Sequence, residues 1–292
     1  MTHQQNWETI FMDKKFVDNY KTGEHITGEF AQSLLDQSGI KEANGNPKKS
    51  LVVLDNACGS GVVSNILNQV LDHQVLANWK LICGDISPGM LEYTRNRMEK
   101  EKWQNAEIKT VDSQDTKLPT EYFTHVITAF AYMALPKATA ALDDNVRILQ
   151  PGGTIAFSTW IEPGWVSIIQ KAVATISSDL PFPSVAEFLS VLSNGEWNSV
   201  SWIESQLKQR GLVNVIVKQE TKAIALKVPE FIEMTMMMFP IVSKNFWTEQ
   251  QRKENTELVR PALAKYVVDL YGKEGEIPME WTAILSTATK PN

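Results

Sequence analysis

One short segment constrains the fold of this chain more than any other feature: an apolar run that ends in a carboxylate. Residues 51–54 read Leu-Val-Val-Leu, Asp55 follows, and residues 57–61 read Ala-Cys-Gly-Ser-Gly. A short run without polar residues is typical of a strand buried on both faces of a parallel sheet. Glycines after such a strand allow the backbone to approach a ligand closely. We therefore predict a ligand-binding turn between a buried strand and a helix.

Two further acids follow the next two predicted strands. Residues 80–85 end in Asp85, and residues 106–110 lead to Asp112. Because the carboxyl ends of parallel strands share one edge of a sheet, the three acids should lie at the same edge. A carboxylate after the second strand can accept both hydroxyls of a ribose, and one after the third can accept an adenine amino group. We expect a nucleoside-bearing cofactor across this edge.

Strand and helix signals alternate from residue 51 onward, which predicts an α/β fold with helices on both faces of a mostly parallel sheet. Strands are expected at residues 51–56, 80–85, 106–110, 125–129, 154–159, 213–226 and 281–288. Helices are expected at 165–177, 184–192, 199–210, 229–238 and 248–271, and from about 62, 88, 135 and 139, with a turn at 150–153. We interpret the chain as one domain with an amino-terminal helical lid (1–45), a cofactor-binding core (50–160), cap helices (161–210 and 228–275) and last strands (211–227 and 281–288).

Charge and composition exclude several classes of protein. The 292 residues carry a net charge of −6, which argues against a nucleic-acid partner. No apolar run is long enough to cross a bilayer and the first residues lack a secretory pattern, so we expect no membrane contact. The two cysteines, Cys58 and Cys83, suit a reducing compartment, and we expect a cytoplasmic protein. No cluster has metal-ligand spacing, so no metal is expected. The oligomeric state is left open.

Each signal also has a simpler interpretation. A single aspartate after a strand is as readily a helix N-cap, and two glycines are as readily turn residues. A dinucleotide fingerprint needs a third glycine, but Ser64 stands at that position. Ser64 therefore counts against a nicotinamide-dependent oxidoreductase, which is one competing function.

Taken together, four segments resemble the motifs of class I S-adenosylmethionine-dependent methyltransferases. They are Asp55–Gly61, Gly84–Leu91, Val111–Ser113 and Arg147–Gly153. The resemblance implies a Rossmann-like sheet of seven strands with an antiparallel last strand. Within this class, the chain most resembles the ubiquinone-biosynthesis type. More narrowly, it resembles fungal small-molecule methyltransferases of secondary metabolism, some of which methylate thiols. Two departures are Ala57, where the motif has its first glycine, and Thr124, where an acid is usual.

The resemblance implies S-adenosylmethionine as the cofactor and S-adenosylhomocysteine as its product. The methionine carboxylate would meet residues 57–61 and Tyr20, and the adenine would lie between Ile86 and the region of Ser113 and Phe130. The implied cofactor-binding residues are Tyr20, Asp55, Ala57, Cys58, Gly59, Gly61, Asp85, Ile86, Met90, Asp112, Ser113, Ala129 and Phe130.

The acceptor of the methyl group should be a small apolar molecule, since apolar residues follow the later strands and fill one cap helix. The residues expected around it are Tyr132, Met133, Trp160, Trp165, Met234, Met238 and Trp247, although such a stripe is more often plain core. His25 and Tyr132 are the candidate catalytic residues. Sulfur, nitrogen and oxygen acceptors all stay open, and the scarcity of bases favours a thiol or amine. A regulatory cofactor-binding protein and a pericyclase that transfers no methyl group are the alternatives.

Overall fold

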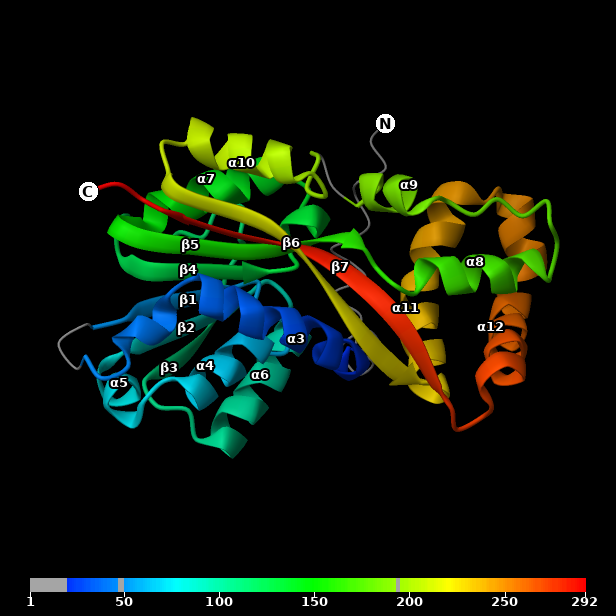
Figure 1. Ribbon diagram of the computed structural model, residues 1–292, viewed down its shortest axis with the longest axis horizontal. Coiled ribbons are helices and arrows are strands. Elements are labelled where there is room, and N and C mark those ends of the chain that lie inside the picture. Colours follow the sequence, from blue (N-terminus) through cyan, green and yellow to red (C-terminus); the bar gives the residue numbers. More distant parts are fainter. Residues whose placement is uncertain (1–19, 47–49, 193–194) are drawn as a thin grey trace.

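The predicted sheet is present and has seven strands (Figure 1). The computed structural model describes residues 20–46, 50–192 and 195–292. Residues 1–19 of the expected amino-terminal lid (1–45) lie outside these ranges. The strands are β1 (Val52–Asn56), β2 (Lys80–Asp85), β3 (Ala106–Thr110), β4 (Phe123–Ala129), β5 (Leu149–Glu162), β6 (Val213–Lys227) and β7 (Glu276–Thr289).

The strand order is β3-β2-β1-β4-β5-β7-β6, with β7 inserted between β5 and β6. The pairs from β3 to β5 are parallel, and β7 runs antiparallel to both of its neighbours. The mostly parallel sheet with an antiparallel last strand is thus confirmed. The chain order reverses at β1, because β2 lies on one side of it and β4 on the other. In an open α/β sheet a ligand site is expected beyond the carboxyl ends of the strands at such a point.

Helices cover both faces of this sheet. The buried apolar side chains of α3 and α4, with Leu91 of α6, belong to one buried cluster, and those of α7 and α10 belong to the other. Each of these helices buries one apolar stripe, such as Val63 and Leu67 of α4. The helices that flank the sheet are α3 (Lys21–Gln37), α4 (Val62–Val70), α5 (His73–Asn78), α6 (Pro88–Glu101), α7 (Ala138–Ile148) and α10 (Val200–Gln209), with short 3₁₀ turns η1 (Ile40–Ala43) and η2 (Tyr132–Ala134).

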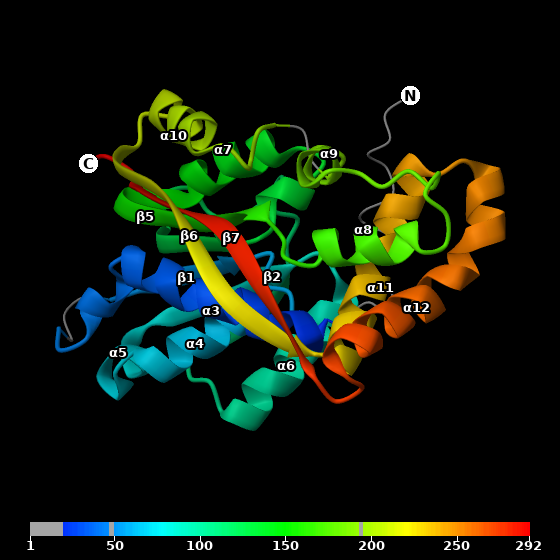
Figure 2. The same ribbon diagram turned by 45° about the vertical axis from the view of Figure 1, so that its right-hand side comes forward.

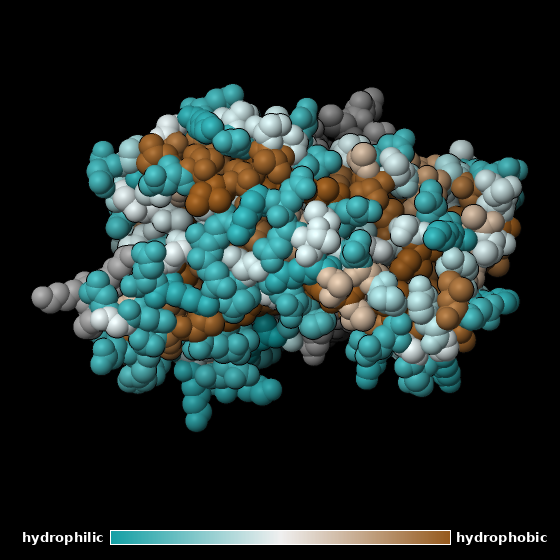
Figure 3. Space-filling view, in the orientation of Figure 1, coloured by the Kyte–Doolittle hydropathy of each residue, from teal (hydrophilic) through white to brown (hydrophobic). Residues whose placement is uncertain are grey.

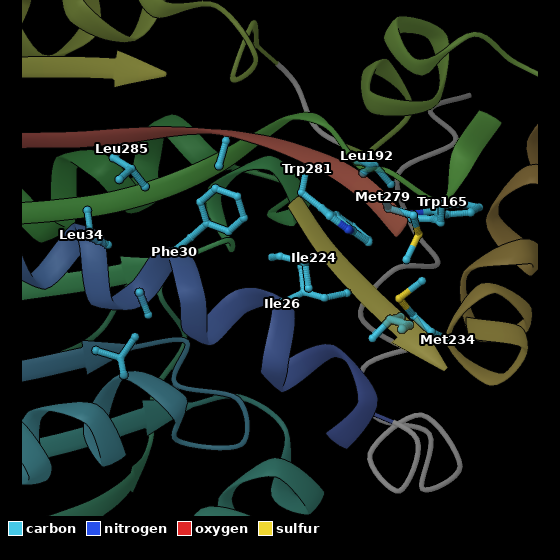
Figure 4. Packing of buried hydrophobic residues seen from close by; sticks show 14 of the residues in the cluster. Ile26, Phe30, Leu34, Trp165, Leu192, Ile224, Met234, Met279, Trp281 and Leu285 are labelled. Atoms are coloured by element: carbon cyan, nitrogen blue, oxygen red, sulfur yellow. The ribbon is translucent and has the colours of Figure 1, made fainter. Parts of the chain in front are cut away.

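Four more helices gather beyond the long strands β6 and β7, as Figures 1 and 2 show from two directions. They are α8 (Val166–Ala174), α9 (Val185–Ser190), α11 (Val228–Phe246) and α12 (Glu249–Tyr271). Along β7 the alternating residues Ile277, Met279 and Trp281 are buried. These side chains and those of α3 belong to one apolar cluster (Figure 4). The amino-terminal helix and the cap helices therefore share one core.

Several element boundaries differ from those predicted. The expected turn at 150–153 is the irregular start of β5, because Leu149 pairs with Phe123 and the register then shifts before His125. Gly152 has a φ of 73°, and its N–H donates to the Lys290 carbonyl at 2.8 Å. The two helices expected near residues 135 and 139 are the single helix α7, α5 was not predicted, and β7 begins five residues before 281.

The cap helix expected to end at residue 238 continues through Pro240 to Phe246. Proline removes one helical hydrogen bond, but its neighbours Phe239, Ile241 and Val242 are buried and hold the helix in place. Packing therefore overrides the local stop signal.

The exposed surface carries apolar residues at the β6 edge of the sheet (Figure 3). Val213 and Ile216 of this edge strand are 44% and 50% exposed. In the described part of the chain, no helix combines the length and apolar character that a membrane span requires.

Candidate active site

A cavity opens beyond the carboxyl ends of β1, β2 and β4, where the sheet order reverses. We call it the first cavity; it holds about 810 Å³ of empty space, part of it open to solvent. Ten of the thirteen predicted cofactor residues line it: Tyr20, Ala57, Gly59, Asp85, Ile86, Met90, Asp112, Ser113, Ala129 and Phe130. Gln114, Ala131, Ala134, Leu135 and Pro136 also line it and were not predicted. Asp55, Cys58 and Gly61 do not line it.

Asp85 is the acidic group best placed in this cavity. Its carboxylate accepts the backbone N–H of Gly59 and that of Ser87, each at 2.8 Å, so its position is fixed from both sides. Burial raises the pKa of Asp85, and these hydrogen bonds oppose the rise. Each carboxylate oxygen has a second lone-pair site, so Asp85 can still accept hydroxyl groups of a bound sugar. Ile86, beside it, is an apolar side chain left 37% exposed.

Asp55 has a different role from the predicted one, because its carboxylate faces the protein interior. It is 1% exposed and accepts the N–H of Ser64 at 3.1 Å and the Ser64 hydroxyl at 2.6 Å. Ser64 lies in the first turn of α4, so Asp55 satisfies the start of this helix in the manner of a cap. Burial raises the pKa of Asp55 to about 7. Ser64, where a third glycine is absent, is thus the partner of Asp55.

The loop after β1 contains three residues in the left-handed region. Ala57 has a φ of 54°, Gly59 of 53° and Gly61 of 75°. Ala57 stands where the resembling motif has glycine, and an alanine side chain is strained in this conformation. Gly61 serves packing, because a Cβ there would lie 2.8 Å from Thr94 Cγ2. Cys58 is 8% exposed, and burial raises the pKa of its thiol.

A buried polar network supports the wall of the first cavity at Ser113. The Ser113 hydroxyl donates to Asn56 Oδ1 at 3.0 Å, and Asn56 Nδ2 donates to Asn145 Oδ1 at 3.0 Å. Asp112 accepts the N–H of Gln114 at 2.9 Å, which closes the turn after β3. Asn145, on α7, therefore connects the cavity wall to the opposite face of the sheet.

A second cavity adjoins the first and is bounded by β5, β7, α3, α8, α9 and α11. It holds about 890 Å³ of empty space, part of it open to solvent. The predicted acceptor residues Met133, Trp160, Trp165, Met234 and Met238 line it. The remaining lining residues are Tyr20, Gly23, Ile26, Thr27, Phe130, Ala134, Pro163, Phe188, Leu189, Leu192, Met237, Ile241 and Trp281. The alternation of apolar residues at 277, 279 and 281 is the sequence signal that could have indicated Trp281.

Tyr20, Phe130 and Ala134 line both cavities and thus form their common wall. Phe130 has a φ of 55°, which is rare and strained for a bulky residue. Its ring stacks on Trp160 with centroids 4.0 Å apart and planes 18° apart. Burial raises the pKa of Tyr20 to about 12, and the carboxylates of Asp85 and Glu24 act in the same direction. Burial thus favours the protonated form of the Tyr20 phenol, which is suited to donating a hydrogen bond.

Three of the residues predicted for catalysis or for the acceptor site lie outside both cavities. Tyr132 is fully buried against the other face of the sheet, where its ring stacks on Trp197 and its oxygen accepts Asn145 Nδ2 at 2.5 Å. The residues after β4 form the 3₁₀ turn η2, which directs this side chain inward. His25 is exposed on α3 and borders a shallow surface depression with Glu29 and Lys222. Trp247 donates to the Pro181 carbonyl at 2.8 Å and packs on Phe239.

Chemically, the two cavities differ. The first contains carboxylates and backbone polar groups, whereas the residues described around the second include no aspartate, glutamate, histidine, lysine or arginine. Among the described residues, no cluster of histidine, cysteine or acidic side chains could hold a metal ion. The second cavity can therefore enclose an apolar molecule and exclude water, but its described walls supply no base.

The fold and these cavities define a class of protein: a Rossmann-like methyltransferase of class I. Residues 53–153 match a family model described as a methyltransferase domain. A phosphoethanolamine N-methyltransferase of Haemonchus contortus, solved with S-adenosylhomocysteine, has the same fold, with a TM-score of 0.59, 15% identity, and coverage of 100% of this chain and 61% of that one. The YcgJ protein of Bacillus subtilis gives a TM-score of 0.53, 13% identity, and coverage of 89% and 99%.

Relatives that match over nearly their whole length establish the family. The acetylaranotin bis-thiomethyltransferase of Aspergillus terreus is 39% identical over 99% of both chains. The methyltransferase tpcH of Aspergillus fumigatus is 39% identical over 97% of this chain and 99% of its own, and the methyltransferase ktnA of Aspergillus niger is 35% identical over 94% and 95%. The chain belongs to this methyltransferase family.

The protein is therefore an S-adenosylmethionine-dependent methyltransferase, and the residues of the first cavity fit that cofactor. Asp85 offers free lone pairs to a ribose, Ile86 and Phe130 offer apolar surfaces, and the backbone approaches closely at Gly59. A regulatory protein and a pericyclase are not favoured.

Proposed function

We propose that the enzyme methylates a thiol of a small, neutral, largely apolar metabolite held in the second cavity. The observation that carries this proposal is the junction of the two cavities at Tyr20, Phe130 and Ala134, which lets a methyl donor and an apolar acceptor meet. The small-molecule substrate predicted from the sequence would accordingly be a neutral, largely apolar thiol.

We propose further that the ten predicted residues of the first cavity hold the cofactor. When bound, S-adenosylmethionine supplies an electrophilic methyl group on a positively charged sulfur. Asp85 would accept from the ribose hydroxyls, Ile86 and Phe130 would pack on the adenine, and the protonated Tyr20 would donate a hydrogen bond at the common wall. Asp55 and Gly61 would act indirectly, through the shape of the loop after β1.

The contribution of the chain to catalysis is alignment and exclusion of water. The aromatic walls at Phe130 and Trp160 would hold the acceptor sulfur in line with the bond between the methyl carbon and the donor sulfur, which is the bond that breaks. As the new carbon–sulfur bond forms, the acceptor proton passes to solvent. Orientation of this kind can supply about 7–11 kcal/mol of barrier reduction in favourable cases.

A thiol fits because its reaction needs little assistance from a base. An alcohol or phenol would need one, and the described walls of the second cavity contain none. The name of one relative, a bis-thiomethyltransferase, agrees with this choice. An unprotonated amine is the second candidate on the same argument.

Turnover with two matched acceptors tests the proposal. The enzyme is incubated with S-adenosylmethionine and either 2-naphthalenethiol or 2-naphthol, and S-adenosylhomocysteine is quantified. We expect methylation of the thiol and little of the naphthol near neutral pH. Asp85→Asn should weaken S-adenosylhomocysteine binding about tenfold or more, measured by calorimetry, because a charged hydrogen-bond acceptor is lost. Methylation of the naphthol alone would contradict the choice of acceptor atom.

The compartment is a separate proposal. We propose a cytoplasmic protein, on the ground that both cysteines, Cys58 and Cys83, are free thiols. Fractionation of the host cells with antibodies against the protein would check it.

A further inference from the structure

Trp281 of β7 carries a buried donor that none of the described residues uses. Its indole Nε1 has no hydrogen-bond partner among the described residues, although the residue is only 3% exposed. An unpaired buried donor costs free energy, and buried tryptophans usually find a partner for this group. The Nε1–H of Trp281 is thus available to donate a hydrogen bond to a bound molecule.

The position of Trp281 distinguishes it from the other buried polar groups for which the described part of the chain provides no partner. Those groups belong to Glu24, Gln37, Ser60, Trp103, Thr235 and Ser286, none of which lines either cavity. Trp281 lines the second cavity, and its indole extends from β7 toward Met234 of α11 (Figure 4). Trp281 therefore belongs to the wall that an acceptor molecule would touch.

A series of rings fixes where Trp281 stands relative to the methyl donor. Phe130 of the common wall stacks on Trp160 at 4.0 Å, and Trp160 packs on Trp281 with centroids 5.4 Å apart and planes 52° apart. Trp281 is thus on the far side of Trp160 from the first cavity. A molecule with its nucleophile beside Phe130 would present its opposite edge to Trp281.

The rest of the wall restricts the chemistry of that molecule. Met234, Met237 and Met238 provide flexible apolar contacts, and none of the residues described around the cavity is charged. A charged acceptor would lose its hydration without compensation. The molecule that fits is neutral, ring-containing, and carries an oxygen at the edge away from the methylated atom.

We propose that Trp281 is a specificity-determining residue, whose Nε1–H donates a hydrogen bond to a carbonyl or ether oxygen of the acceptor. This inference rests on the proposed function, because it assigns the second cavity to the acceptor. It concerns binding and orientation, and Trp281 takes no part in the transfer of the proton.

A pair of probes that differ in one oxygen tests the hydrogen bond. The dissociation constants of 1-tetralone and tetralin are measured on enzyme saturated with S-adenosylhomocysteine, for the wild type, Trp281→Phe and Trp165→Phe. The last variant is a matched control, since Trp165 lines the same cavity and its nitrogen is not among the unpartnered buried atoms. We expect Trp281→Phe to lower the preference for tetralone over tetralin about three- to tenfold, and Trp165→Phe to leave it unchanged.

The nitrogen–proton NMR spectrum of the nine indole groups gives a second measurement. In it, the ligand is added only to the wild-type enzyme. The Trp281 signal is assigned by its absence from Trp281→Phe. It should move downfield when tetralone is added to the wild type and should show no such shift with tetralin. The inference is overturned if the preference for tetralone over tetralin is the same in wild type and Trp281→Phe, or if neither probe binds. Failure of the wild type to bind S-adenosylhomocysteine would instead overturn the assignment of the first cavity.

Discussion

Arg97 of α6 and Glu24 of α3 form an ion pair at 2.5 Å, with side chains only 18% and 17% exposed. The same guanidinium donates to the Ser60 carbonyl at 2.9 Å, in the loop after β1. One side chain therefore connects the amino-terminal helix to the loop of the first cavity. Neither residue was predicted to matter.

Replacing Arg97 by Met should weaken cofactor binding. Glu24 would keep its charge in a mostly buried position, and the contact to Ser60 would be lost, so α3 and the loop should loosen. We expect the dissociation constant of S-adenosylhomocysteine to rise about tenfold, which corresponds to about 1.4 kcal/mol. Calorimetric titration measures it.

Two further variants interpret this result. The double variant Glu24→Gln with Arg97→Met should recover part of the lost affinity for S-adenosylhomocysteine, because the uncompensated charge is gone. Lys265→Met breaks the ion pair with Asp269, whose side chains are 77% and 60% exposed. This variant should leave the dissociation constant of S-adenosylhomocysteine unchanged. Wild-type affinity in Arg97→Met would show that the contact is incidental.

We expect Asp55 to make the stability of the ligand-free protein depend on pH. Its pKa rises from the ordinary value of 3.8 to about 7 on folding, so the folded state holds a proton that the unfolded state releases. Stability from this group is present below pH 3.8 and is lost as the pH rises to about 7. A rise of this size corresponds to a loss of about 4 kcal/mol at most.

Urea unfolding of the wild type and Asp55→Asn between pH 4.5 and 7.5 checks this prediction. The difference in unfolding free energy, wild type minus variant, should fall as the pH rises. A difference that stays constant or increases across this window would mean that Asp55 is ionised throughout.

Ala57→Gly should stabilise the protein. The φ of 54° at Ala57 penalises a Cβ, and glycine removes the penalty at the cost of a more flexible unfolded chain. We expect a net gain of about 0.5–1 kcal/mol in chemical denaturation. Ala140→Gly, the same change inside α7, should instead destabilise by about 1 kcal/mol. A loss of stability in both variants would refute the assignment of strain to the loop.

Tyr132→Phe separates a structural role from a catalytic one. The phenol is buried beside Asn145 and away from both cavities, so its removal should lower stability by about 1 kcal/mol. The rate of methyl transfer by the folded enzyme should stay within about twofold. Tyr20→Phe, at the common wall, should show the opposite pattern, with slower transfer and little change in stability. A large loss of rate in Tyr132→Phe would restore it as a catalytic candidate.

The local pattern was sufficient to predict the sheet core. Alternating strand and helix signals define β1 to β4, and the residue that follows a buried strand must lie at its carboxyl end. Residues such as Asp85 and Asp112 were therefore assigned to the correct edge without any tertiary information. The cap was harder, because α11 continues through Pro240 for reasons of packing that no local signal carries.

The direction of individual side chains depended on the tertiary structure. Asp55 and Asp85 look alike in the sequence, yet one faces Ser64 in the interior and the other faces the cavity. Tyr132 was expected in the acceptor site, but the turn η2 sends it to the opposite face.

The amino-acid sequence by itself thus indicated where the strands lie along the chain and which edge of the sheet bears the acids, because these follow from periodicity and from acids at strand ends. The class of reaction followed from the resemblance of four segments to a known family. Only the tertiary structure decided that Arg97 meets Glu24 and that Trp281 of the last strand borders the same cavity as Trp160. Such pairs are far apart in the chain, and their contact depends on how whole helices and strands pack rather than on any neighbouring residue.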